Sequence, residues 1–260
     1  MNRKRSQTKS DDTRTLSVDI GGTGIKAIIL NDQGDALTER GRIETPRPAT
    51  PRAILRVIDR LARAQGPFDR ISVGFPGVVR NGVTKTAPNL DEGWQNFALA
   101  KELGKRFKRP VRVANDADVQ GFGAIDGHGV ELVLTLGTGL GSALFADGTL
   151  VPNLELAHHR FRRGKTYEEQ LGNAALKKAG KGRWNKRLRR ALRTLERLFS
   201  YDRVYLGGGN AKKITGALPP KTKTVPNIAG LLGGIALWRA NSSGEKVGKG
   251  VRNLFLTNYT

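Results

Sequence analysis

The chain has 260 residues, 38% of them hydrophobic, which is enough to bury one large core or two moderate ones. Its 45 Lys and Arg against 23 Asp and Glu give a net charge of +22 that attracts polyanions, yet no zinc finger, RNA-binding aromatic motif or N-terminal helix-turn-helix segment is visible. No apolar run is long enough to span a membrane, and residues 1–14 are a basic tail without the hydrophobic segment of a signal peptide. The absence of cysteine excludes disulfides. We therefore expect a cytoplasmic protein.

The first predicted feature is a β-hairpin over residues 16–30, in which two β-branched runs flank a glycine-rich turn. The glycines should allow positive φ and bring backbone N–H groups close to an anion such as phosphate. Asp19, at the end of the first strand, has the oxygen ligands that Mg²⁺ prefers, bound directly or through water. The turn itself supplies Gly21, Gly22, Thr23, Gly24 and Lys26. A purely structural Gly-Gly hairpin is the alternative, which this motif alone does not exclude.

Strands and helices alternate after this hairpin, which is typical of an α/β fold. We predict a third strand at residues 36–44, a proline-rich connector, helices at 51–64 and 96–107, a buried strand at 70–77, a polar loop at 85–90 that carries Asn89, and a strand at 110–116.

The pattern restarts near residue 130, about 117 positions after the first hairpin. We predict strands at 130–136 and 142–146 around a glycine-rich turn, helices at 167–178 and 183–199, a strand at 204–206 that leads into three glycines, and a helix at 228–240. Such a repeat predicts two related α/β lobes with a cleft between them. We place the first lobe at residues 15–117, completed by the helix near 228–240, and the second at 118–227, with a mixed tail at 241–260.

Three glycine-rich turns in this order, with Asn115 and Asp116 between the first and the second, resemble the sugar kinases of the ROK family, and most of all the polyphosphate/ATP glucokinases and glucomannokinases. The resemblance covers roughly residues 16–240 and implies the actin-like ATPase (ribonuclease H-like) fold, with two α/β lobes flanking a central cleft. It implies that the first two turns hold the phosphates of ATP or polyphosphate, that Asp19 binds Mg²⁺, and that the third turn lies against the nucleoside. The donor-binding residues would be Asp19, Gly21, Gly22, Thr23, Gly24, Lys26, Gly137, Thr138, Gly139, Gly207, Gly208 and Gly209.

Asp116 is the candidate general base. A sugar hydroxyl is a poor nucleophile, so a kinase needs a carboxylate that accepts its proton as the bond to phosphorus forms. The alternative is that Asp116 only caps a helix over residues 118–124, a common use of aspartate. The resemblance favours the base, with Asn115 beside it holding sugar hydroxyls.

The resemblance places sugar recognition mainly in residues 153–169. Carboxylates and imidazoles accept paired hydrogen bonds from vicinal hydroxyls, which makes them selective for a sugar. Glu169 competes with Glu168 for this role, and His158 and His159 are alternatively surface residues. The implied sugar contacts are Asn89, Asn115, Asp116, Glu155, His158 and Glu168.

Two departures from the family pattern lie in the same segment. Most of the family carries a cysteine-rich zinc motif after this histidine, and this chain has no cysteine, so we expect no zinc. Ala157 stands where the family usually has glycine.

Basic residues concentrate in residues 177–193, and a second basic cluster comprises Arg160, Arg162, Arg163 and Lys165. Within residues 177–193 apolar residues recur at helical spacing, so the helix predicted over 183–199 should pack this apolar stripe inward and expose its cations. These cations form either an ordinary solvated face or a track for a polyanion. The stripe is Trp184, Leu188, Ala191, Leu192 and Leu195.

The predicted activity is Mg²⁺-dependent phosphoryl transfer from ATP, polyphosphate or both to the 6-hydroxyl of glucose or mannose. The alternative is a regulatory protein without efficient turnover that responds to sugar or binds a polyanion, either DNA or polyphosphate. We expect no sequence-specific nucleic-acid partner. The preferred donor, the preferred sugar and the existence of a homodimer stay open at this point.

Overall fold

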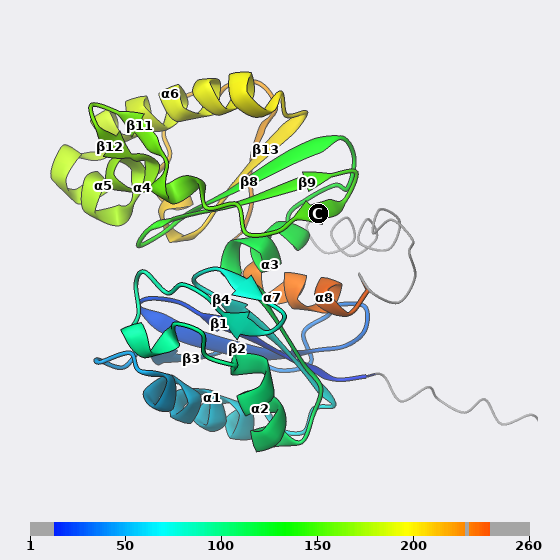
Figure 1. Cartoon of the computed structure of the whole chain (residues 1–260). Helices are drawn as coiled ribbons and strands as arrows, with labels where there is room; N and C mark the ends of the chain where they lie inside the picture. The colour runs from blue at the N-terminus through cyan, green and yellow to red at the C-terminus, as the bar shows by residue number, and fades with distance from the viewer. Residues whose placement is uncertain (1–12, 227–228, 240–260) are drawn as a thin grey trace, which may run out of the picture.

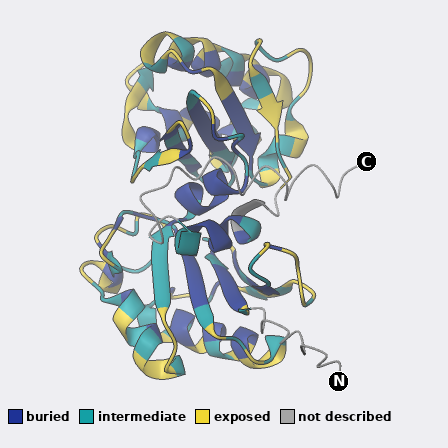
Figure 2. Ribbon diagram, turned by 90° about the vertical axis from the view of Figure 1, so that its right-hand side faces the viewer, coloured by how far each residue is buried: buried dark blue, intermediate teal, exposed yellow. Residues whose placement is uncertain are grey.

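The computed structural model describes residues 13–226 and 229–239. Two α/β lobes, each with a five-stranded sheet, lie one above the other, and α3 (Asp116–Phe122) and α7 (Ala229–Leu232) lie between them (Figure 1). The buried residues concentrate in the strands of both sheets and in the helix between the lobes (Figure 2).

The first sheet has the strand order β3-β2-β1-β4-β7. β1 pairs antiparallel with β2, and β2 with β3, whereas β1, β4 and β7 run parallel. The glycine turn between β1 and β2 and the carboxyl ends of β4 and β7 therefore share one edge of the sheet, where ligands of α/β proteins usually bind. The strands are β1 (Thr15–Ile20), β2 (Gly24–Leu30), β3 (Gly41–Glu44), β4 (Arg70–Phe75) and β7 (Val111–Asn115).

The second sheet repeats this arrangement with the order β10-β9-β8-β13-β14. β8 pairs antiparallel with β9, and β9 with β10, whereas β8, β13 and β14 run parallel. The predicted repeat of strand, glycine turn and strand is thereby confirmed, although the exact lobe boundaries at 117 and 227 stay predictions. The strands are β8 (Val130–Leu136), β9 (Leu140–Ala146), β10 (Thr149–Val151), β13 (Arg203–Gly207) and β14 (Thr222–Thr224).

Amphipathic helices cover the sheets. α1 (Pro51–Gln65) begins at Thr50, whose hydroxyl accepts a hydrogen bond from Ala53 N, and buries its apolar face in the first core. α2 (Leu99–Phe107) lies beside it (Figure 1). In the second lobe, α4 (Tyr167–Leu171), α5 (Asn173–Ala179) and α6 (Lys181–Phe199) pack together, and the predicted apolar stripe of α6 is fully buried. Two hairpins, β5–β6 (Val79–Arg80 and Val83–Thr84) and β11–β12 (Arg160–Arg162 and Lys165–Thr166), complete the strands, and single 3₁₀ turns lie at Glu92–Trp94, Leu156–His158, Gly209–Lys213 and Gly233–Ile235.

Several predicted elements are shorter than expected. The strand predicted over 36–44 begins only at Gly41, and Ala36 makes an isolated bridge to Leu30. The helix predicted over 167–178 is interrupted at Gly172, which has extended backbone. The short edge strands β10 and β14 were not predicted, because three largely exposed residues are too few to show an alternating pattern.

The helix predicted over 228–240 is three short turns, α7, the 3₁₀ turn at 233–235 and α8 (Ala236–Arg239); Ile228 and Ala240 themselves lie outside the described residues. Gly233 lets this segment pack closely against α3, since a Cβ on Gly233 would lie 1.8 Å from the Val119 carbonyl oxygen. This segment returns to the first sheet, where Ser17 Oγ donates to Leu231 O at 2.7 Å and Ser72 Oγ donates to Gly234 O at 2.7 Å. Within the described part of the chain, no helix is long and apolar enough to cross a membrane.

Candidate active site

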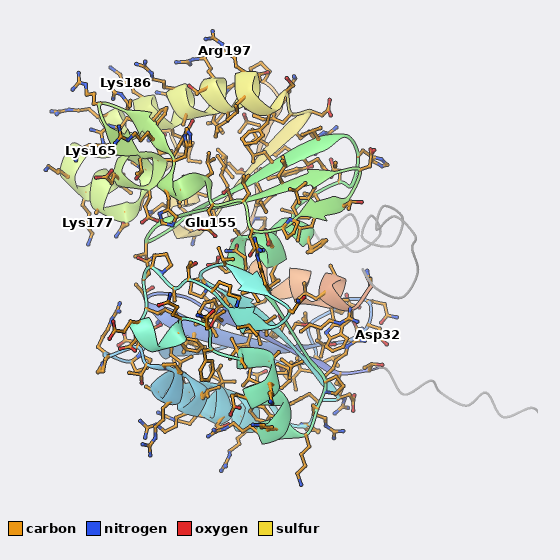
Figure 3. The ribbon with its side chains drawn as sticks, in the orientation of Figure 1. Asp32, Glu155, Lys165, Lys177, Lys186 and Arg197 are labelled. Atoms are coloured by element: carbon orange, nitrogen blue, oxygen red, sulfur yellow. The ribbon has the colours of Figure 1, made fainter. Side chains whose placement is uncertain are left out.

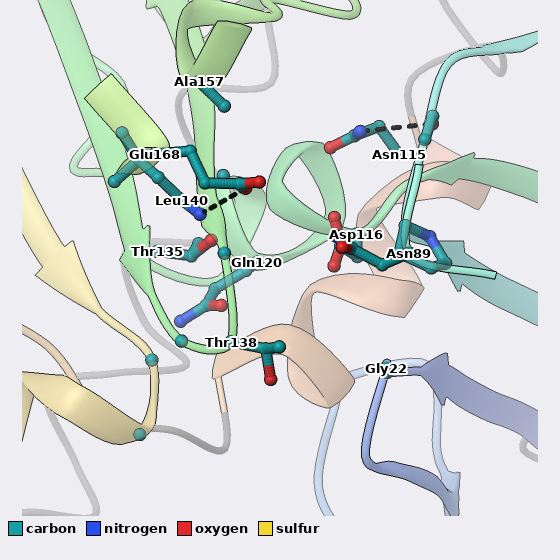
Figure 4. Close-up of a pocket in the computed structure, with 18 of the residues that line it drawn as sticks. Gly22, Asn89, Asn115, Asp116, Gln120, Thr135, Thr138, Leu140, Ala157 and Glu168 are labelled. Atoms are coloured by element: carbon teal, nitrogen blue, oxygen red, sulfur yellow. Dashed lines mark hydrogen bonds between the residues drawn. The ribbon is translucent and has the colours of Figure 1, made fainter. Parts of the chain in front are cut away.

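A cavity of about 500 Å³ lies between the two lobes, and nearly all of the predicted site residues line it. From the first lobe come the turn after β1, Asn89, Asn115 and Asp116, and from the second lobe come the turn after β8, Glu155, His158 and Glu168. Gly207 is the exception, because it is the last residue of β13 and only Gly208 and Gly209 reach the cavity. Figure 4 shows Asp116 between Asn89 and the Glu168 side of the cavity, with Gly22 and Thr138 at one end.

Asp116 lies where β7 ends and α3 begins. The helix cap is Asn115, whose Oδ1 accepts hydrogen bonds from Ala117 N at 2.8 Å and Asp118 N at 3.3 Å. The interpretation of Asp116 as the cap of a helix over 118–124 is therefore wrong, since Asp116 is the first helical residue. Its only described hydrogen bond is the one its Oδ1 accepts from Ala117 N at 2.8 Å, so the carboxylate faces the cavity. Asn115 also donates from Nδ2 to Gly77 O at 3.2 Å, which leaves one amide hydrogen of Asn115 for a ligand.

Burial raises the pKa of Asp116 to about 7, and the negative charge of Asp19 adds to the effect. A carboxylate with a pKa near neutral pH is much more basic than ordinary aspartate and is still deprotonated in a large fraction of molecules. That combination suits a general base, because a pKa near the working pH balances the fraction in the basic form against its affinity for the proton.

Each glycine turn is closed by a backbone hydrogen bond, which spans three residues in the first turn and two in the second. Gly21 N donates to Gly24 O at 3.1 Å, and Gly137 N donates to Gly139 O at 3.1 Å. The expected positive φ at Gly21, Gly22 and Gly24 is wrong, because none of them belongs to the glycines with positive φ. The close approach of the backbone to itself explains the glycine at position 21 instead, since a Cβ on Gly21 would lie 2.8 Å from Gly24 O. Both turns therefore expose bare backbone to the cavity.

Asp19 and Lys26 face each other across the first hairpin, with Lys26 Nζ 2.7 Å from Asp19 Oδ2. Within the described residues, no group of three or more His, Cys, Asp or Glu side chains is placed to hold a metal ion. A kinase magnesium typically uses one or two carboxylates, with the substrate phosphates and water as its other ligands. The single carboxylate of Asp19 beside the turn fits that pattern.

The second lobe presents a pair of carboxylates to the cavity. Glu168 Oε2 accepts a hydrogen bond from Leu140 N at 3.1 Å (Figure 4), and Glu155 Oε2 lies 3.4 Å from His158 Nε2. Burial raises the pKa of Glu155, His158 opposes this and Glu168 reinforces it. Glu169 faces away, because it forms a capping box with Thr166 at the start of α4. The cavity therefore receives Glu168 and not Glu169.

The chain is similar to known proteins both in sequence and in fold. Residues 15–153 match the ROK family. The chain belongs to the ROK family. It is 34% identical to the polyphosphate glucokinase of Mycobacterium tuberculosis over 235 residues, which covers 84% of this chain and 88% of that protein.

The ROK-family chain also has the fold of solved members. The crystal structure of inorganic polyphosphate/ATP-glucomannokinase from Arthrobacter sp. superposes with a TM-score of 0.79 at 36% identity, covering 87% of this chain and 100% of that one. A ROK family glucokinase from Streptomyces griseus, solved in complex with glucose and AMPPNP, superposes with a TM-score of 0.70 at 21% identity, covering 87% of this chain and 99% of that one, which is a likeness of fold. The actin-like ATPase fold, with two lobes flanking a cleft, is thereby established.

Arg42 and Gln120 are among the cavity residues of this ROK-family chain that were not predicted. Arg42, in β3, is exposed at the rim and donates from Nη2 to Thr23 O at 3.3 Å, which places a cation beside the first turn. Gln120, in α3, lines the cavity next to Thr135 (Figure 4), and its buried Nε2 has no hydrogen-bond partner among the described residues. Neither has a sequence signal, because each depends on neighbours that are distant along the chain. Ala157, at the position usually glycine, lies in the 3₁₀ turn at the cavity wall.

Proposed function

We propose that this chain transfers a phosphoryl group from ATP, polyphosphate or both to the 6-hydroxyl of glucose or mannose, with Asp116 as general base. The chain is a sugar kinase of the hexokinase type. The observation that carries the finer assignment is the single cavity in which two phosphate-type turns, an isolated carboxylate with a raised pKa, and a second pair of carboxylates meet.

Each part of the cavity has a distinct task in this proposal. The amides of the two turns, with Thr23 and Thr138, bind the terminal phosphates of the donor, and Arg42 adds positive charge at the rim. The sugar hydroxyls exchange hydrogen bonds with five side chains, those of Glu155, Glu168, His158, Asn89 and Asn115. Asp116 accepts the proton of the attacking hydroxyl. Because the two sides belong to different lobes, lobe closure would exclude the water that competes with the sugar.

Magnesium fits the donor side of this site. Asp19 would hold Mg²⁺ directly or through a water molecule, and the bound ion would neutralise charge on the donor phosphates. Lys26 holds the Asp19 carboxylate in place through their 2.7 Å ion pair.

The two glutamates at the start of α4 provide a test of sugar binding. Replacing Glu168 with glutamine should raise the KM for glucose by roughly tenfold or more, because a charged acceptor in the cavity is lost. Glu169→Gln is the matched control, since glutamine preserves the capping box and the position faces away from the cavity. Steady-state kinetics with varied glucose measure both. Equal KM values for the two variants would remove Glu168 from the sugar site.

The basic surface bears on the choice of donor. Arg162, in the β11–β12 hairpin, lies near Arg187 and Arg190 of α6, and its pKa is lowered by desolvation and by the charges of Arg163, Arg190 and Arg187. Lys165 and Lys186 point outward from this end of the second lobe, whereas Glu155 lies at its cleft side (Figure 3). Arg189 is tied to the fold, because it donates to Thr215 O at 2.9 Å. The cations of the β11–β12 hairpin and of residues 177–193 have no carboxylate partner among the described ion pairs. This unpaired positive charge supports binding of polyphosphate along these residues.

Salt should separate the two donors. If polyphosphate binds along this surface, its apparent affinity should fall steeply with ionic strength, since each neutralised phosphate releases counterions. ATP makes fewer charge contacts and should respond less. The measurement is the KM for each donor from about 50 to 200 mM salt. Equal salt dependence of the two KM values would eliminate the track.

Glucose-dependent consumption of ATP or polyphosphate tests the proposed function itself. We expect turnover that requires both sugar and Mg²⁺. Binding of DNA without sequence preference, combined with no sugar-dependent turnover, would instead support the regulatory alternative.

A further inference from the structure

Asn153 links the two lobes beside the cavity. It lies in the loop between β10 and the 3₁₀ turn at Leu156–His158, and its side-chain amide makes two hydrogen bonds to one residue of the opposite lobe. Val79 N, in β5, donates to Asn153 Oδ1 at 2.9 Å, and Asn153 Nδ2 donates to Val79 O at 3.1 Å. The amide thus pairs with Val79 as a neighbouring strand would, which fixes both the distance and the orientation of the loop.

Asp118 holds the backbone of the same residue. The residue is 2% exposed, and its Oδ2 accepts a hydrogen bond from Asn153 N at 3.2 Å. Its other oxygen, Oδ1, has no hydrogen-bond partner within the described residues, and no cation pairs with it in the described ion pairs. Burial, reinforced by the charge of Glu155, raises the pKa of Asp118 to about 7. A buried carboxyl group so poorly compensated is costly to the fold, which points to a role in the site.

The backbone of Asn153 is itself specialised. Its φ is 60°, in the left-handed region that only glycine and a few polar residues adopt readily. This turn aims the amide at β5 while the chain continues, two residues later, to Glu155 in the cavity. A single residue therefore connects α3, which carries the proposed base, to the sugar loop and to the first lobe.

We propose that Asp118 and Asn153 are positioning residues that hold the Asn153–Glu155 loop against β5, so that Glu155 and Asp116 face the same sugar. The inference rests on the proposed function and extends it, because neither residue lines the cavity and neither touches the reacting atoms. Asp118 acts through the backbone of Asn153, and Asn153 acts through Val79. Loss of the link would release the sugar loop and leave the donor turns intact.

Asn153→Gly is the direct test. Glycine adopts a φ of 60° without strain, so the loop backbone keeps its path while both bonds to Val79 are lost. We expect the KM for glucose to rise about tenfold or more and kcat to fall, since two hydrogen bonds near the site disappear. The KM for the donor should stay within about twofold. Asn81→Gly is the matched control, because Asn81 has a φ of 51° in the adjacent β5–β6 turn, is exposed and lies outside the cavity.

Asp118 provides a rescue experiment. Asp118→Asn retains an oxygen that can accept from Asn153 N, so its KM for glucose should stay within about threefold of the wild-type value. Asp118→Ala removes the acceptor and should raise this KM as Asn153→Gly does. The double variant Asp118→Ala, Asn153→Gly should be little worse than either single variant, because both changes break the same link.

The outcomes separate this inference from the proposed function. Wild-type and Asn81→Gly turnover establishes the kinase activity, and their failure would overturn the proposed function. With active wild type, an unchanged KM for glucose in Asn153→Gly would overturn the positioning role. So would an equal rise in the KM values of sugar and donor together with a lower Tm, since that pattern indicates general loosening of the fold.

Discussion

Replacing Asp116 with asparagine should lower kcat by roughly 10²–10⁴-fold, because the amide cannot accept the proton of the sugar hydroxyl. The substitution conserves shape, and Asn115 rather than Asp116 caps α3, so the fold should persist. Steady-state kinetics and a far-UV spectrum of the variant measure the two effects. Near-normal turnover in Asp116→Asn would show that another group is the base.

The pH dependence gives this prediction a second readout. Since the pKa of Asp116 in the folded chain is about 7, wild-type kcat/KM should fall about tenfold per pH unit below that value. The kcat/KM of Asp116→Asn should not show this fall at low pH. Asp118→Asn should retain it, which distinguishes the two buried carboxyl groups whose pKa values are both raised to about 7.

The same pKa shift has a consequence for stability. A carboxyl group whose folded pKa lies above its unfolded pKa contributes stability at low pH, and the contribution is lost as pH rises through the folded value. For Asp116 the window runs from 3.8, the ordinary value, to about 7. Asparagine does not ionise, so Asp116→Asn should gain stability relative to wild type as pH rises through this window. Urea unfolding at pH 5 and pH 8 measures the difference.

Gly139→Ala should lower kcat/KM by about 10²-fold, although the backbone at Gly139 tolerates alanine. A Cβ at this position would lie 2.1 Å from Glu168 Oε2 and 3.6 Å from Asn89 Nδ2. The carboxylate is the end of a flexible side chain, so it can move away without unfolding the lobe. It would then lose its hydrogen bond from Leu140 N and leave the sugar site. The glycine therefore couples the donor turn to sugar recognition.

Gly182→Ala is the control for this substitution. Gly182 lies in the first turn of α6, where a Cβ meets nothing within 4 Å, so activity should be unchanged and the free energy of unfolding should not fall. Wild-type kcat/KM in Gly139→Ala would contradict the placement of the sugar beside Glu168.

Local patterns were sufficient to predict the two hairpins that carry the glycine turns and most helices. Those features depend on residues that are near one another along the chain, such as the β-branched runs around Gly21–Gly24 and the apolar stripe of α6. The family resemblance was then needed to predict that Asp116 and Glu155 contact the same sugar.

The features that could not be predicted arise from distant contacts. The glycines of the first turn are required by close approach to Gly24 O rather than by positive φ, which depends on the folded path of the turn. The residue that caps α3 is Asn115 and not Asp116, and no sequence pattern resolves a difference of one residue. The pairing of Asn153 with Val79 joins residues 74 positions apart, and a lone asparagine in a loop carries no signal of such a partner.

The most direct measurement is a four-way assay of sugar 6-phosphate formation, with glucose and with mannose as acceptor and with ATP and with polyphosphate as donor. We expect at least one sugar and donor pair to give the 6-phosphate in a Mg²⁺-dependent reaction, and Asp116→Asn to reduce every active pair by the same large factor. Absence of sugar phosphate with all four pairs, from a folded wild-type protein that binds the donor, would contradict the proposed activity.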